Sequence, residues 1–130
     1  MLTNVELLKK AKDASNFSYA KYSNFAVGAC VMFESGNFYT GCNVENASYG
    51  LSLCAERNAI STAIASGEKS KIKAIAIYSP NAPMCSPCGA CRQWIHELKS
   101  DNGTFVVLAD ENFNPVVYSI DELLPIGFVL

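Results

Sequence analysis

The chain has 130 residues, half of them apolar, with six cysteines and a formal net charge of −2. This length and composition suit one domain with an ordinary core, so we expect a single domain over residues 1–130. The longest apolar runs are too short to cross a bilayer, and the first ten residues do not have the order of charged and apolar residues that a signal peptide has. The net negative charge argues against a nucleic-acid partner. We therefore expect a soluble cytoplasmic protein.

The hydrophobic pattern predicts the following elements in chain order. Asn4 is expected to cap a first helix over residues 4–16, because Val5, Leu8 and Ala11 recur at helical spacing. A buried strand over 26–33, a turn over 34–37 and a returning strand over 38–42 should form a hairpin. The remaining expected elements are a loop over 43–52, a helix over 54–65, a strand over 72–78, a proline-rich loop over 79–87, a helix over 88–99, strands over 104–109 and 115–119, and a short helix over 120–124.

This order of elements predicts a three-layer α/β/α sandwich built on a five-stranded mixed sheet. In such folds the working residues gather where loops lead into the N-termini of helices. Cys54 opens one predicted helix, and Cys88 and Cys91 open another, so both cysteine motifs fall at such points.

Cys54, Cys88 and Cys91 are the candidate ligands of a metal ion. Cys88 and Cys91 are three residues apart, which places both sulfurs on one face of a first helical turn. Three protein ligands leave one position open, which is typical of catalytic rather than structural zinc. Glu56 follows Cys54 by two residues and is the candidate proton carrier, and Arg57 is a candidate hydrogen-bond donor to the ligand sulfurs.

The other cysteines and the single histidine have weaker claims to the metal. Cys85 also forms a CxxC pair with Cys88, but the intervening proline favours a helix start at Cys88 and leaves Cys85 in the loop. Cys30 and Cys42 fall in predicted strands and are expected to be packing residues. His96 lies on a different helical face from the motif cysteines, so we expect a structural or surface role for it.

At these residues the sequence resembles the cytidine deaminase family, in its small homotetrameric, zinc-dependent form with three cysteine ligands. The resemblance covers about residues 15–128 and is carried by five segments: Phe25-Ala26-Val27-Gly28-Ala29, Gly41-Cys42-Asn43-Val44-Glu45-Asn46-Ala47, Cys54-Ala55-Glu56-Arg57, Pro87-Cys88-Gly89-Ala90-Cys91-Arg92-Gln93 and Glu122-Leu123-Leu124-Pro125.

The resemblance implies a substrate site as well as a metal site. Phe25 would stack on the pyrimidine ring, Asn43 and Glu45 would hydrogen-bond the ribose hydroxyls, and Glu56 would also contact ring N3. Phe128 would reach from one subunit into the site of its neighbour, since the resemblance implies a homotetramer with sites near subunit interfaces. As plain alternatives, Phe25 and Phe128 would be core residues, and Asn43 and Glu45 would shape a turn.

The implied reaction is the hydrolytic deamination of cytidine and deoxycytidine to uridine and deoxyuridine, with one Zn²⁺ per subunit supplying the hydroxide that attacks C4. This reaction belongs to pyrimidine salvage and needs no organic cofactor. Three alternatives stay open at this point. They are a blasticidin-type deaminase, a polynucleotide deaminase, and a non-catalytic zinc-stabilised binding module with Cys85 as the fourth ligand.

Overall fold

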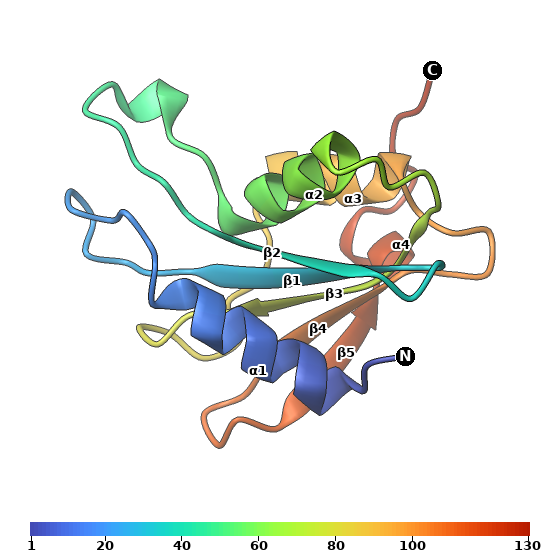
Figure 1. The fold of residues 1–130 in the computed structure, drawn as a ribbon, viewed down its shortest axis with the longest axis horizontal. Coiled ribbons are helices and arrows are strands. Elements are labelled where there is room, and N and C mark those ends of the chain that lie inside the picture. Colours follow the sequence, from blue (N-terminus) through green and yellow to red (C-terminus); the bar gives the residue numbers. More distant parts are fainter.

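A computed structural model describes residues 1–130 as three layers around one sheet (Figure 1). Helix α1 covers one face of the sheet, and α2, α3 and α4 lie on the other. The predicted α/β/α sandwich with a five-stranded mixed sheet is therefore confirmed. The elements are α1 (Asn4–Ser15), β1 (Gly28–Phe33), β2 (Phe38–Cys42), the short 3-10 helix η1 (Tyr49–Leu51), α2 (Ala55–Ala65), β3 (Ile72–Tyr78), α3 (Gly89–Glu97), β4 (Phe105–Ala109), β5 (Pro115–Ser119) and α4 (Ile120–Leu123).

The strand order is β2-β1-β3-β4-β5. β3 and β4 run parallel and are joined through α3, whereas the other neighbouring strands are antiparallel. The parallel pair requires a crossover, and α3 supplies it on the same face of the sheet as α2. The N-termini of α2 and α3 thereby come close together.

Strand β1 is buried along its whole length, between β2 and β3 in the sheet and between helices on both faces. Ala29, Val31 and Phe33 belong to the apolar core beneath α2 and α3. Cys30 and Met32 point the other way, into the core beneath α1. Burial on both faces explains why this stretch is continuously apolar instead of alternating.

The cap of α1 differs from the prediction. Thr3 is the N-cap, because its side chain accepts a hydrogen bond from the amide of Glu6 while the Glu6 carboxylate accepts one from the amide of Thr3. This reciprocal pair satisfies two helix-end donors, and Asn4 is the first helical residue rather than the cap. The helix buries Leu7 and Leu8 against the sheet.

The other boundaries that differ from the prediction do so by one to two residues. The short helix η1 was not predicted and lies within the predicted loop over 43–52. Cys54 and Cys88 have extended backbone conformations and cap α2 and α3 instead of lying inside them. Helix α3 ends at Glu97 rather than at residue 99, and β1 begins at Gly28 rather than at residue 26. None of the helices is long and apolar enough to span a membrane.

Candidate metal centre and active site

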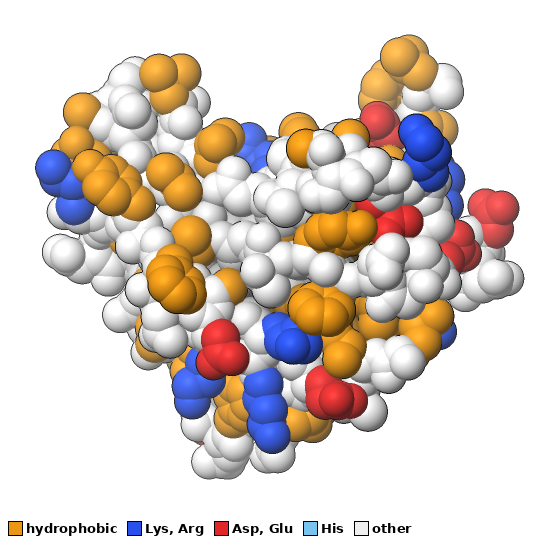
Figure 2. Space-filling view, viewed as in Figure 1, with side chains coloured by type: hydrophobic (Ala, Val, Ile, Leu, Met, Phe, Trp, Pro, Cys, Tyr) orange, Lys and Arg blue, Asp and Glu red, His pale blue; other side chains and the backbone are white.

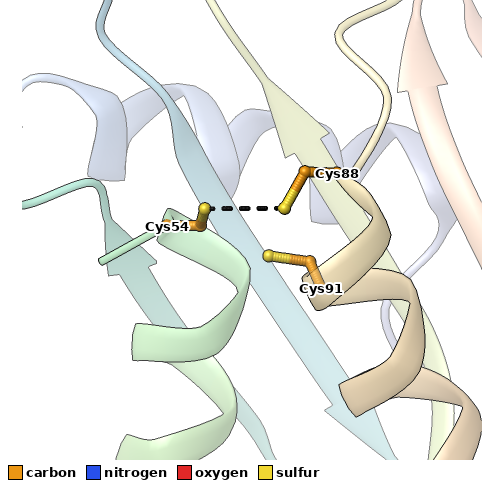
Figure 3. Close-up of side chains that lie close together, drawn as sticks. All are labelled: Cys54, Cys88 and Cys91. Carbon is orange, nitrogen blue, oxygen red and sulfur yellow. Dashed lines mark hydrogen bonds between the residues drawn. The ribbon is translucent and has the colours of Figure 1, made fainter. Parts of the chain in front are cut away.

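The three predicted ligand cysteines meet between the N-termini of α2 and α3 (Figure 3). Their sulfur atoms all lie within 4.8 Å of one another, and the Sγ atoms of Cys54 and Cys88 are 3.8 Å apart. Cys54 and Cys88 are the N-caps of α2 and α3, and Cys91 lies in the first turn of α3. Residues 34 positions apart in the chain are thus brought to one point by the crossover of α3.

The electrostatics of this cluster suit a bound cation. Hydrogen bonding from Cys91, with a further contribution from Arg57, lowers the pKa of Cys54 to about 5, while the same pairing raises the pKa of Cys91. Three sulfurs this close cannot all ionise without strong mutual repulsion, and a divalent ion among them removes that repulsion. A set of three thiolates is a donor set that zinc favours.

The three cysteines differ in their exposure to solvent. Cys91 is fully buried, Cys54 is half-buried, and Cys88 is exposed. Cys85 lies outside the group of close sulfurs, so no fourth cysteine joins the three ligands. The three cysteines therefore fit one zinc ion with a position left for water, as expected for a catalytic site.

Arg57 lies where the prediction put it, against a ligand sulfur. Its Nη2 atom donates a hydrogen bond to Sγ of Cys54 over 3.4 Å. The guanidinium brings positive charge to a centre that three thiolates would make negative. The Nε atom of Arg57 is buried and has no hydrogen-bond partner within the chain.

Glu56 is almost completely buried, with only 4% of its surface exposed. Burial, reinforced by the charge of Cys54, raises the pKa of its carboxyl group to about 7. An ideal helical wheel would separate Glu56 from Cys54, but the extended conformation of the Cys54 cap removes that separation. Both residues line one cavity, and a carboxyl group with this pKa can accept and release a proton near neutral pH.

A cavity of about 280 Å³ lies beside the cysteine cluster. Its size suits a small ligand, and its walls combine apolar surface with a few polar groups. Six of the residues singled out from the sequence line it together: Phe25, Asn43, Glu45, Cys54, Glu56 and Cys88. Two of the candidate metal ligands and three of the candidate substrate-binding residues therefore share one cavity with Glu56.

Asn43 holds the segment that carries Phe25. Its Oδ1 atom accepts a hydrogen bond from the amide of Val27 over 2.9 Å, and its Nδ2 atom donates one to the carbonyl of Phe25 over 2.7 Å. Asn43 thus shapes the chain here, as the structural alternative expected. An amide side chain has two donors and two acceptor lone pairs, so one donor and one lone pair remain free.

Glu45 holds the backbone at Tyr22 and Ser23 in a similar way. Its carboxylate accepts hydrogen bonds from the amides of Tyr22 and Ser23, each over 3.1 Å, and from the hydroxyl of Ser23. The hydrogen bond from the Ser23 hydroxyl makes the largest contribution to lowering the pKa of Glu45. Glu45 is therefore a fixed anion at the edge of the cavity, and its second oxygen keeps a lone pair for another donor.

The remaining predicted residues lie elsewhere. Phe128 is exposed on the C-terminal segment and does not line the cavity of its own chain. Cys30 is buried in the core beneath α1, as expected of a packing residue, and Cys42 is half-buried at the end of β2. His96 is buried on α3, away from the sulfur cluster, which agrees with a structural role.

Part of the cavity wall is formed by residues that were not among the candidate site residues. Ser52, Leu53 and Ala55 line it from the approach to α2, and Cys85 and Ser86 line it from the approach to α3. All five flank a ligand cysteine in sequence. Their proximity to Cys54 and Cys88 was the signal that could have identified them.

Comparison with known proteins agrees with this geometry. Residues 1–107 match the family model described as the cytidine and deoxycytidylate deaminase zinc-binding region. The chain is 39% identical over 122 residues to a cytidine deaminase of Halalkalibacterium halodurans, covering 94% of this chain and 91% of that protein. A cytidine deaminase of Sporosarcina psychrophila is 44% identical over 93 residues, covering 72% of this chain and 68% of that protein.

Solved structures resemble the whole fold. The crystal structure of cytidine deaminase from Burkholderia pseudomallei has a TM-score of 0.88 and 43% identity, and the match covers 98% of this chain and 100% of that one. The cytidine deaminase from Mycobacterium tuberculosis has a TM-score of 0.81 and 35% identity, with 95% of each chain covered. Sequence motifs, fold and metal cluster agree, and the chain belongs to the cytidine and deoxycytidylate deaminase family, whose zinc-binding region it carries.

Proposed function

We propose that the chain is a zinc-dependent cytidine deaminase that hydrolyses cytidine and deoxycytidine to uridine and deoxyuridine and releases ammonia. One observation carries the proposal. Two cysteines of the three-cysteine metal cluster, a buried carboxyl group and an aromatic side chain beside polar groups line one cavity of nucleoside size. The named relatives in Halalkalibacterium and Burkholderia support the same reaction.

Glu56 is proposed to move the protons of the reaction. Zinc, when bound, supplies the lowered pKa that turns water into a nucleophile near neutral pH. The Glu56 carboxylate accepts a proton from the water that attacks C4 of the ring, and it delivers this proton to ring N3. The second proton of that water passes to the amino group as the bond between C4 and this nitrogen breaks, and the group leaves as ammonia. The pKa of about 7 suits a group that must work in both directions.

Phe25, Asn43 and Glu45 are proposed to select a nucleoside. Phe25 offers a ring face for the pyrimidine, and its position is fixed by the Asn43 side chain. The unused donor and lone pair of Asn43 and the unused lone pair of Glu45 are suitable partners for ribose hydroxyls. A site built to bind hydroxyl groups discriminates against bases without a sugar, because its polar groups would then be buried unpaired.

We also propose a homotetramer in which Phe128 of one subunit contacts the site of a neighbour. Large apolar side chains are exposed on the outer surface of α2, α3 and the C-terminal segment: Ile64, Trp94, Phe128, Val129 and Leu130. Such a concentration is typical of an interface between subunits. The six free cysteines support a reducing compartment, and we propose that the protein acts as one domain in cytoplasmic pyrimidine salvage.

The test of the reaction compares the wild type with Glu56→Ala and Glu56→Gln in ammonia-release assays on cytidine. Both variants should retain zinc, because Glu56 is not a ligand, and both should lose at least about 10³-fold in kcat. Either variant working at the wild-type rate would remove Glu56 from the mechanism. Cytidine, deoxycytidine, blasticidin S and single-stranded DNA are assayed in parallel, and turnover of the last two alone would refute the nucleoside assignment.

The metal site has its own test. Cys85→Ser should retain one zinc per subunit, whereas Cys91→Ser should lose it, because Cys85 lies outside the sulfur cluster. Loss of zinc from Cys85→Ser would identify a fourth ligand and favour a structural site.

The tetramer is tested by light scattering and by complementation. Coexpression of Glu56→Ala subunits with Phe128→Ala subunits should give more activity than either alone. Some sites in the mixture then combine an intact Glu56 with an intact neighbouring Phe128. A mixture no more active than its separate parts would show that Phe128 does not act across the interface.

A further inference from the structure

The C-terminal segment follows a defined path over α3 before it leaves the fold. Arg92 donates from Nη1 to the carbonyl of Leu123 over 2.8 Å, at the end of α4. Gln93 donates from Nε2 to the carbonyl of Phe128 over 2.9 Å. The C-terminal end of the chain projects away from the body of the molecule, as Figures 1 and 2 show. The segment is therefore held at two points by neighbouring residues of one helix.

A third contact lies between these two. The backbone of Gly127 passes so close to the ring of His96 that a Cβ atom on Gly127 would lie 2.7 Å from both Cδ2 and Nε2. His96 is only 6% exposed, so its ring has little freedom to move aside. Gly127 does not have a positive φ, and its backbone conformation alone would accept alanine. The ring of His96, rather than the backbone geometry, is what requires glycine here.

The backbone of Ile126, the residue before Gly127, indicates that contacts with the rest of the fold determine the path of the C-terminal segment. Ile126 has a φ of 54°, in the left-handed region that β-branched residues avoid. Its side chain is fully exposed and makes no packing contact that would offset the strain. A strained residue persists only when its surroundings fix it, and the flanking contacts of Arg92, Gln93 and His96 do so here.

We propose that Arg92, Gln93 and His96 form a tail latch, a set of positioning residues on α3 that fixes the direction in which Phe128 leaves the subunit. The proposal rests on the proposed role of Phe128 in a neighbouring site. Arg92 also donates from Nε to the carbonyl of Pro87 over 2.8 Å. The same helix therefore connects the loop before a metal ligand with the segment that carries the aromatic ring to the neighbour.

The latch would favour substrate binding by holding the C-terminal segment in its binding conformation beforehand. A free C-terminal segment would lose the conformational freedom of several residues each time Phe128 entered the neighbouring site. A segment held at Leu123, Gly127 and Phe128 has already lost it. Loosening the latch should thus weaken substrate binding more than it slows the chemical step, which depends on Glu56 and the metal.

The test uses Gly127→Ala, His96→Ala and the double variant, with Phe128→Ala to measure the full effect of losing the ring. Gly127→Ala should raise the KM for cytidine towards that of Phe128→Ala, about tenfold, with little change in kcat. Removing the ring in His96→Ala makes room for the added methyl group. Arg92 and Gln93 still hold the segment in the double variant, so its KM should be lower than that of Gly127→Ala. Gly50→Ala is the control, because a Cβ there meets nothing within 4 Å.

Two further comparisons separate the latch from a general structural effect and from the role of Phe128. Adding Gly127→Ala to Phe128→Ala should raise KM no further, since the latch acts through that ring; a further tenfold rise would overturn the proposal. Amide hydrogen exchange at residues 127–130 should become faster in Gly127→Ala and slow again in the double variant. Unchanged exchange in Gly127→Ala overturns the latch. If exchange becomes faster in Gly127→Ala but the KM of Phe128→Ala equals that of the wild type, the role of Phe128 is refuted instead.

Discussion

Gly41→Ala is a direct test of how the sheet positions α2. Gly41 lies in β2 beneath α2, the helix that Cys54 caps and that carries Glu56 in its first turn. A Cβ atom at position 41 would lie 2.5 Å from the amide nitrogen of Ala59 and 2.7 Å from the carbonyl oxygen of Ala55. Both neighbours are helix backbone, so no side-chain rotation can relieve the contact.

The size of the effect follows from these distances. The contact to Ala59 is about 0.9 Å shorter than the 3.4 Å at which ordinary van der Waals contact begins. Helix α2 must move away from β2 by a comparable amount, and overpacking of this kind costs about 1–3 kcal/mol. We expect the upper end of that range, or a fall in Tm of about 10 °C. A displacement near 1 Å of Glu56 should also reduce kcat about 100-fold.

Thermal unfolding followed by circular dichroism, together with ammonia release from cytidine, measures both effects. Gly50→Ala is the matched control, since its added methyl group meets nothing within 4 Å, and its Tm should stay within about 2 °C of the wild type. A Gly41→Ala protein with wild-type Tm and wild-type turnover would refute the argument that close backbone packing sets the position of α2.

Three other substitutions test separate parts of the structure. Arg57→Gln removes the hydrogen bond to Cys54 and should weaken zinc binding about 10–100-fold, measured by chelator competition. Ile126→Asn places a residue that tolerates the left-handed region at an exposed position and should raise the free energy of unfolding by about 1 kcal/mol in urea titrations. Hydrogen bonds, first from Ser70, lower the pKa of Glu68 to about 2, so the stability that Glu68 contributes is present above about pH 4.5 and is lost as pH falls towards 2. Urea midpoints of Glu68→Gln should therefore be lower than those of the wild type at pH 7 and should change less between pH 4.5 and 2.

The sequence predicted the order of the elements and the metal cluster for identifiable reasons. Hydrophobic runs such as residues 72–78 are long enough to indicate a strand buried on both faces, and the structure has β3 there. The spacing of Cys88 and Cys91, with a proline before them, indicated one helical turn with two ligands. Such signals are local, so a single sequence contains them.

Contacts between segments that are distant in the chain could not be predicted from local sequence patterns. Nothing in the motif around Asn43 indicated that both ends of its amide would hold the backbone at Phe25 and Val27. The contact between Gly127 and His96 joins residues 31 positions apart, and neither residue has a distinctive neighbourhood in sequence. These pairings are decided by how the loops pack over the sheet, which requires the three-dimensional fold.

The helix ends show how the fold reserves its sulfur atoms for the metal. Helices α1 and α4 are capped by Thr3 and Ser119, each in a reciprocal capping box. Helices α2 and α3 have Cys54 and Cys88 at the same position, and neither side chain makes a capping hydrogen bond. Omitting a cap costs a helix about 1 kcal/mol, so two helices forgo stability that the other two obtain. Helix-end amides that lack a capping partner favour thiolate over thiol. The preference for a capping side chain is therefore not met at the two helix ends where a metal site needs ionised cysteines.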